Sequence, residues 1–117
     1  MIHVSRGPET ICLRCLFSGS MGFRLKGLLG RASLGGDEGI LLRPCNAIHM
    51  WFMKFPIDAL FLDRDGRIVK IYHSIRPWQA TRTWWKVKSV LEVAAGTAAR
   101  VGLKEGDLFT FRETGPA

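Results

Sequence analysis

The segment IDALFLDRDGRIVKIYH, Ile57 to His73, constrains the fold more than any other part of the chain. It holds two apolar runs on either side of the polar sequence DRDG, and aspartate and glycine tolerate the backbone dihedrals of tight turns. The segment therefore predicts an antiparallel hairpin in which Ile57–Leu62 pairs with Arg67–His73. Pro56, just before it, favours extended geometry at the preceding residue and lacks a backbone donor, so we expect a bend or a strand edge there.

Apolar or alternating runs elsewhere predict further strands around this hairpin. They lie at Thr10–Phe17, Ile40–Pro44, Ile48–Met53, within Val87–Gly96, and at Leu108–Glu113. A short helix is predicted to begin near Ser20, a second one lies within Thr97–Gly102, and residues 75–86 predict a loop. The predicted fold class is therefore α+β, with a mostly antiparallel, strongly curved or barrel-like sheet of about six or seven strands and two short helices.

Length and composition bound the class of protein. The 117 residues predict one domain, 1–117, with a core from about 10 to 112, and 47% of them are hydrophobic, which is enough to bury a core. The net charge of +7 favours anionic partners. No run approaches the roughly 18 apolar residues of a membrane-spanning helix. The first ten residues lack the plan of a signal peptide, so we expect a cytoplasmic protein, unless translation starts further upstream.

Asp58 and His49 are polar side chains within the most apolar block of the chain. A carboxylate in such surroundings is costly unless it is satisfied, so Asp58 is expected to accept backbone N–H groups freed at Pro56 or to pair with an arginine such as Arg43. A neutral His49 could hydrogen-bond Asp58 or a backbone carbonyl. Structural roles are the commoner outcome for both residues, and the functional alternative is a perturbed pair that lines a cleft.

An enzyme would need a third group beside this pair. Cys45 lies four residues before His49, and Cys45, His49 and Asp58 would complete a nucleophile, a base and an orienting group. No nucleophile-elbow or protease sequence surrounds Cys45, so no catalytic residue is assigned.

A metal site is another alternative. Cys12, Cys15, Cys45 and His49 form a ligand set that suits tetrahedral zinc. Residues three apart on a strand point to opposite faces, so Cys12 and Cys15 would converge only in a turn. We therefore expect structural thiols, with no metal and no cofactor.

The stretch from Gly66 to Leu91 contains no acidic residue. Its cations and tryptophans are Arg67, Lys70, Arg76, Arg82, Lys86, Lys88, Trp78, Trp84 and Trp85. Cations among flat aromatic rings suit an anionic membrane surface, an acidic protein or single-stranded nucleic acid. Nucleic acid is the less favoured partner because no known nucleic-acid-binding motif accompanies the stretch. The plain alternative is that the rings cover one open end of the sheet and the cations are solvated.

Several blocks of the sequence resemble the DUF192 family, a group of small prokaryotic proteins without an established activity. They are R-x-x-G-L-L-x-R from Arg24 to Arg31, G-I-L-L-R-P-C from Gly39 to Cys45, I-H-x-x-F-M-x-F-P-I-D-A-L-F-L-D-x-D-G from Ile48 to Gly66, V-L-E-x-x-x-G from Val90 to Gly96, and G-L-K-E-G-D from Gly102 to Asp107. The resemblance implies a compact α+β domain on an antiparallel, barrel-like sheet. The resemblance also implies that many members of the family carry an N-terminal export signal, which we do not expect from the first residues of this chain, and the family supplies no accepted catalytic residues.

We therefore expect a non-catalytic binding module with a cleft at one end of the curved sheet. The expected lining is Arg43, His49, Trp51, Met53 and Asp58, with Trp78, Trp84 and Trp85 at a basic rim. Arg24 and Arg31 could converge on the same place. The expected ligand or partner is anionic or amphipathic.

Overall fold

The structure, a computed structural model, describes residues 2–18 and 33–113. Seven strands form one hydrogen-bonded order, β5-β4-β6-β3-β2-β1-β7, and one short helix, α2, follows β6. Their bounds are β1 Ile2–Arg6, β2 Glu9–Ser18, β3 Glu38–Leu42, β4 Ile57–Leu62, β5 Ile68–Ile75, β6 Ser89–Ala94, α2 Thr97–Arg100 and β7 Thr110–Glu113. The prediction of a mostly antiparallel α+β sheet is confirmed, although β2 and β3 pair in parallel.

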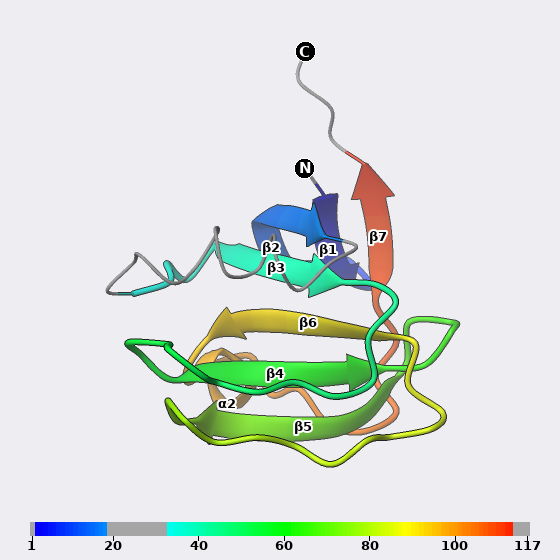
Figure 1. Cartoon of the computed structure of the whole chain (residues 1–117). Coiled ribbons are helices and arrows are strands. Elements are labelled where there is room, and N and C mark those ends of the chain that lie inside the picture. Colours follow the sequence, from blue (N-terminus) through cyan, green and yellow to red (C-terminus); the bar gives the residue numbers. More distant parts are fainter. Residues whose placement is uncertain (1, 19–32, 114–117) are drawn as a thin grey trace.

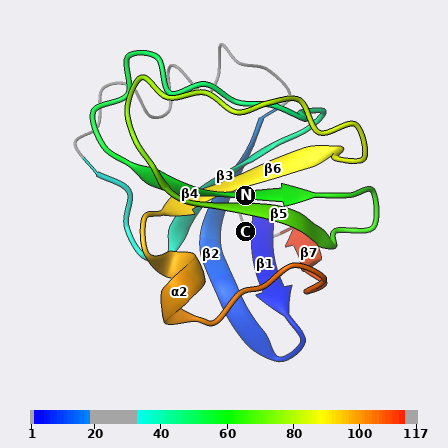
Figure 2. The ribbon, with the colours of Figure 1, turned by 90° about the horizontal axis from the view of Figure 1, so that it is seen from below.

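In the described residues the strands do not form a closed barrel, so the barrel-like form that the sequence suggested is not confirmed. β5 and β7 lie at opposite edges of the strand order, but the start of β5 meets the segment before β7 through a bridge between Arg67 and Leu108, and Ile68 N–H donates to Asp107 O at 2.8 Å. β5, β4, β6 and β3 run alongside one another, and the second half of β2 runs parallel to β3, whereas β1, β7 and the first half of β2 cross them steeply (Figures 1 and 2). The first strand, Ile2–Arg6, was missed, and the expected strand at Ile48–Met53 is a loop with a single bridge, between His49 and Ala80. The helix expected near Ser20 lies outside the described residues, as do Arg24 and Arg31.

The predicted hairpin forms the centre of the fold. β4 pairs with β5 on one side and β6 on the other, and every residue of β4 is buried. Asp63 closes the turn: its Oδ1 accepts the N–H groups of Asp65 and Arg67 at 2.9 and 3.0 Å. Gly66 has φ 89°, a left-handed value that favours glycine.

Two hydrophobic clusters fill the two faces of the sheet around β4. Ile57, Ala59 and Phe61 belong to one cluster, and Leu60 and Leu62 belong to the other, as strand alternation requires. The first cluster is covered by two long loops, residues 43–56 and 76–88, which hydrogen-bond to each other. The second is covered by β1, β2, α2 and the segment that leads to β7. None of the helices in the described residues has the length and apolar character needed to span a membrane.

Candidate functional site: an exposed aromatic face on two paired loops

Residues 43–56 and 76–88 run along each other over the first hydrophobic cluster. Cys45 N–H donates to Lys88 O, and Trp84 N–H donates to Asn46 O, both at 3.0 Å. Further along, Thr81 N–H donates to Ile48 O at 2.9 Å. The inward side chains of the pair are apolar, so the loops act as a cover that is anchored along its length.

The tips of these loops are joined by short backbone hydrogen bonds. Met50 N–H donates to Gln79 O at 2.7 Å, and Trp78 N–H donates to Met50 O at 2.8 Å. Met53 N–H closes a turn onto Met50 O at 3.3 Å. The side chain of Gln79 accepts the N–H of Arg76 at 2.7 Å, which fixes the second tip. Both tips are therefore held in one arrangement by bonds between them and within them.

Four ring side chains meet at the joined tips: His49, Trp51, Phe52 and Trp78. Trp51 and Trp78 have ring centroids 6.0 Å apart, and Phe52 meets Trp78 edge-on at 4.9 Å. His49 stacks on Trp51 at 5.3 Å. Trp51, Phe52 and Trp78 are 39%, 64% and 59% exposed, although large apolar side chains are usually buried. We call these four residues the aromatic face.

The backbone of this face is strained. Phe52 and Trp78 have φ values of 66° and 69°, a left-handed conformation that costs an ordinary residue about 1–2 kcal/mol. Both are bulky residues in positions that suit glycine or asparagine. Such outliers persist only where the surroundings over-determine them, and they cluster at functional sites.

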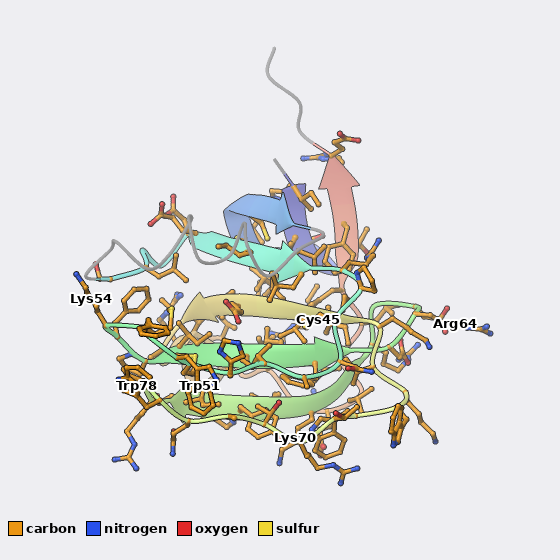
Figure 3. The ribbon with its side chains drawn as sticks, in the orientation of Figure 1. Cys45, Trp51, Lys54, Arg64, Lys70 and Trp78 are labelled. Carbon is orange, nitrogen blue, oxygen red and sulfur yellow. The ribbon has the colours of Figure 1, made fainter. Side chains whose placement is uncertain are left out.

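The charged side chains on the two loops that carry the face have one sign. Lys54 and Arg76 are exposed, and each lies two residues from a ring of the face in the sequence. The sequence from 44 to 57 and from 66 to 88 contains no aspartate or glutamate. Figure 3 shows Trp51, Trp78 and Lys54 at the end of the molecule where β4 begins, with Arg64 at the opposite end. The face therefore presents apolar rings in a cationic setting.

The structure separates most of the residues expected to line one cleft. Among Arg43, His49, Trp51, Met53 and Asp58, it brings together His49 and Trp51. Met53 and Asp58 are buried, at 4% and 0% exposure, and leave no surface for a ligand. Arg43 is exposed at the far end of the cover, where its guanidinium lies 5.8 Å from the ring of Phe111.

Asp58 fastens the fold. Its Oδ1 accepts Ser74 N–H at 2.8 Å and its Oδ2 accepts Ala98 N–H at 2.9 Å. The prediction that backbone donors satisfy this carboxylate is correct in kind, but the donors come from β5 and the first turn of α2 instead of the bend at Pro56. Asp58 points to the cluster opposite the one under the cover, whereas His49 Nδ1 accepts Trp51 N–H at 3.3 Å. The orienting pair that an enzyme would need is therefore not assembled.

The tryptophans of the second loop have different roles. Trp84 is half-buried against the first cluster, its Nε1–H donates to Tyr72 Oη at 2.9 Å, and Arg82 lies 4.2 Å from its ring. Trp85 is 79% exposed and follows Trp84, whose N–H donates to Asn46 O, so it belongs to a part of the cover other than the tips that Met50, Trp78 and Gln79 join. Sequence reasoning placed both at the rim and missed Phe52. The adjacent bulky residues Trp51 and Phe52 were a usable indication, because neighbours on a strand cannot both face one core.

Shallow pockets flank the cover without reaching the aromatic face. One, of about 230 Å³, is lined by Pro44, Cys45, Asn46, Val87 and Lys88. Another, of about 190 Å³, is lined by Tyr72, His73, Ile75, Gln79 and Ala80. Cys45 donates its thiol to Ala47 O at 3.2 Å. Neither pocket contains a nucleophile beside a base and an orienting carboxylate.

The cysteine pair of β2 differs from the expected geometry. Cys12 and Cys15 are both buried in the second cluster, although residues three apart on a regular strand point to opposite faces. A bulge explains this: Val4 pairs with Cys12 and Ile2 with Cys15, so the strand gains one residue between them. A hydrogen bond to Cys12, and then burial, raise the pKa of the Cys15 thiol well above its usual range. Within residues 2–18 and 33–113, no cluster of three histidine, cysteine or acidic side chains could hold a metal ion.

Glu92 is a buried carboxylate that sequence reasoning did not single out. It lies on β6, fully buried, opposite Ile40 of β3 and Ala59 of β4. Strand alternation places it on the same side as Val90, beneath the cover. Its position in the apolar run SVLEVA was the available indication.

Comparisons with known proteins agree with this description. A protein of unknown function from Novosphingobium aromaticivorans DSM 12444 has a similar structure, with a TM-score of 0.78 and 25% identity over 93% of this chain and 82% of that one. A candidate transcription regulator from Sinorhizobium meliloti 1021 matches with a TM-score of 0.74 and 24% identity over 94% of this chain and 91% of that one, a likeness that concerns the fold alone. Comparison with curated proteins finds no match. The model of the family DUF192, described as "Uncharacterized ACR", matches residues 18–111, so the chain belongs to the DUF192 family.

Proposed function

We propose that this DUF192 domain is a non-catalytic binding module, that its binding surface is the aromatic face, and that its partner is anionic or amphipathic. The observation that supports the proposal most is the exposure of Phe52 and Trp78 on a left-handed backbone. The left-handed backbone of each residue costs folding free energy, and each ring leaves apolar surface in water that folding does not bury. A binding partner that covers the rings would remove this apolar surface from water.

The joined tips support the same proposal. Binding is stronger when the bound arrangement already exists, because ordering side chains and loops costs free energy. The bonds of Met50 with Gln79 and Trp78 hold the rings in place without a ligand. Lys54 and Arg76 add exposed cations to the two loops that carry the rings, which favours a partner with negative charge.

An amphiphile with a phosphate head tests this proposal without knowledge of the natural partner. Dodecyl phosphate, below its critical micelle concentration, should shift the amide resonances of residues 48–54 and 76–81 saturably. Dodecyltrimethylammonium has the same chain and the opposite charge, and should bind more weakly. Phe52→Asn should weaken the response to dodecyl phosphate, because asparagine tolerates the left-handed backbone but lacks the ring.

Trp85→Ala is the matched control, since it removes a more exposed ring outside the face. It should leave the response to dodecyl phosphate unchanged. The proposal is wrong if neither amphiphile shifts the tips, or if the shifts gather at the pocket between Pro44 and Lys88.

A further inference from the structure

We infer that the partner of the aromatic face is the surface of a lipid bilayer with anionic headgroups, into which the joined loop tips insert. The inference rests on the proposed function and names its partner. It depends on how the rings pack, on how the tip backbone is hydrogen-bonded and on which charges surround the tips.

The rings of Trp51, Phe52 and Trp78 pack against one another in one cluster instead of standing apart as separate stacking surfaces. Single-stranded nucleic acid stacks its bases on ring faces that are accessible one by one. Here Phe52 meets Trp78 edge-on at 4.9 Å, and Trp51 is tilted against Trp78 at 6.0 Å. Each ring therefore covers part of the surface of its neighbour. A contiguous apolar protrusion suits a fluid, apolar medium better than it suits a row of stacked bases.

The residue types suit the depth at which such a cluster would lie. Tryptophan favours the boundary between headgroups and acyl chains, because its ring is apolar and its indole N–H is polar. Phe52 lacks a polar group and is the most exposed ring of the face, at 64%. It would lie deepest, with Trp51 and Trp78 at the boundary.

The tip backbone can leave bulk water at low cost. An unsatisfied N–H group costs several kcal/mol in hydrocarbon, which excludes most loops from a bilayer. At these tips the N–H groups of Met50, Trp51, Met53, Trp78 and Gln79 have acceptors within the two loops, whereas the described hydrogen bonds include none from Phe52 N–H. Most of the tip N–H groups therefore need no water, and the N–H of Phe52 is the one that would add a cost on insertion.

The charges favour anionic headgroups over neutral ones. Lys54 and Arg76 are exposed and lie two residues from Phe52 and Trp78 in the sequence, and their long side chains can keep the charge at headgroup level while the stems lie along the apolar layer. The absence of acidic residues from 44–57 and 66–88 leaves no repulsive charge on either loop. Each cation near an anionic surface strengthens binding by about fivefold.

Co-sedimentation with large unilamellar vesicles tests the inference. Vesicles of phosphatidylcholine that contain about 30% phosphatidylglycerol should bind the protein more tightly than vesicles of pure phosphatidylcholine. Phe52→Asn should weaken binding by about tenfold or more, because an apolar ring no longer leaves water. Lys54→Gln and Arg76→Gln should each weaken binding to the anionic vesicles by about fivefold and leave binding to neutral vesicles unchanged. Trp85→Ala should change neither.

The other occupants of the face have separate outcomes. If the oligonucleotide dT15 binds through Phe52 and Trp78 while anionic vesicles do not, the lipid inference is overturned and the proposed function stands. If sedimentation velocity shows a dimer that Phe52→Asn dissociates, the face is a contact between two copies, and the lipid inference is overturned. If the amide resonances of residues 48–54 respond to none of the three probes (vesicles, oligonucleotide and dodecyl phosphate), both proposals are overturned.

Discussion

Phe52 and Trp78 place bulky rings on a left-handed backbone that glycine or asparagine would adopt with less strain. A core residue can hold such a conformation because packing compensates for it, but these rings are 64% and 59% exposed. The compensation comes instead from the hydrogen bonds that join the tips, which hold the backbone whatever side chain it carries. The two side chains are therefore expected to contribute little to the stability of the fold, which fits the binding role that we propose for them.

Phe52→Asn should leave the free energy of unfolding within about 1 kcal/mol of the wild-type value. The relief of the left-handed strain, about 1–2 kcal/mol, offsets the loss of the ring pair with Trp78, about 0.5–1.5 kcal/mol. Urea unfolding followed by circular dichroism measures this difference. Phe61→Ala, in the first cluster, is the contrasting control and should cost about 3–5 kcal/mol. A cost of that size at Phe52 would show that its ring belongs to the core.

Asp58→Asn should destabilise the fold by about 2–4 kcal/mol. One amide oxygen can replace only one of the two carboxylate oxygens, so either Ser74 N–H or Ala98 N–H loses its acceptor in a buried place. Urea unfolding should show a lower midpoint at an unchanged slope. Asp65→Asn, at the exposed hairpin turn, is the control and should stay within about 0.5 kcal/mol. A similarly small effect at Asp58 would mean that the buried bonds contribute nothing net.

The kind of role that Asp58 has could be predicted from the sequence, but its donors could not. A carboxylate in an apolar run must be satisfied, and backbone N–H groups are the commonest donors. The donors lie 16 and 40 residues further along the chain, so they are near Asp58 only once β5 and α2 have packed. A hydrogen bond between His49 and Asp58 was one possibility that the sequence left open. The alternation of side chains along β4 directs Asp58 to the second cluster, whereas His49 lies on the loop that covers the first cluster.

At the scale of elements, β2 shows how a partner strand can override alternation. The sequence alone predicts that Cys12 and Cys15 diverge, which argued against a shared site. The bulge that aligns them is defined by pairing with β1, and that strand was not expected. Local sequence does not reveal a bulge, because the extra residue is extra only relative to a partner strand.

The β1–β2 hairpin is fastened to the segment after α2 by Arg6. Its guanidinium donates to Asp107 Oδ2 at 2.8 Å and to Val101 O at 2.7 Å. Desolvation of Asp107 raises its pKa, but the hydrogen bonds from Arg6 and Lys104 outweigh this and lower the pKa overall. A carboxyl whose pKa is lower in the folded state stabilises the fold above its unfolded pKa, and that stability is lost as the pH falls through the folded pKa.

Asp107→Asn should therefore cost stability at pH 7 and cost progressively less below about pH 4. The expected cost at pH 7 is about 1–3 kcal/mol, since hydrogen bonds to a charged group are lost. Urea unfolding across this pH range measures it. Arg6→Gln should remove most of the same pH dependence, because the hydrogen bond from Arg6 is the largest of the effects that lower the pKa of Asp107. An equal cost of Asp107→Asn at pH 3 and pH 7 would contradict the assignment.

The two neighbouring tryptophans of the second loop should differ strongly. Trp84→Ala removes a half-buried ring and its bond to Tyr72, and should cost about 2–4 kcal/mol. Trp85→Ala removes an exposed ring and should stay within about 0.5 kcal/mol. Thermal unfolding of the two single variants compares them. Equal costs would show that the loop does not pack as described.

For the whole molecule, the sequence predicted the local pairing correctly, whereas the barrel-like form of the sheet is not confirmed. The hairpin of β4 and β5 follows from two apolar runs and one turn, all within a short stretch. The parallel pairing of β2 with β3 and the steep crossing of β1, β7 and the first half of β2 depend on contacts between distant segments (Figure 2). Residues 75–86 were predicted as a loop, whereas Ile48–Met53 was expected to be a strand. The joining of the two loops at their tips arises from the fold, and it is this joining that creates the aromatic face.

Quenching of tryptophan fluorescence by brominated acyl chains in anionic vesicles is the most direct test of whether the aromatic face binds lipid, because it reports which rings enter the bilayer. The wild type should be quenched, the Trp51→Phe/Trp78→Phe double variant should lose most of the quenching, and Trp85→Phe should retain it. The two altered rings of the double variant lie at the joined tips, whereas Trp85 belongs to another part of the cover. Quenching that survives in the double variant, or that disappears with Trp85→Phe, would contradict the assignment of the aromatic face as the binding surface.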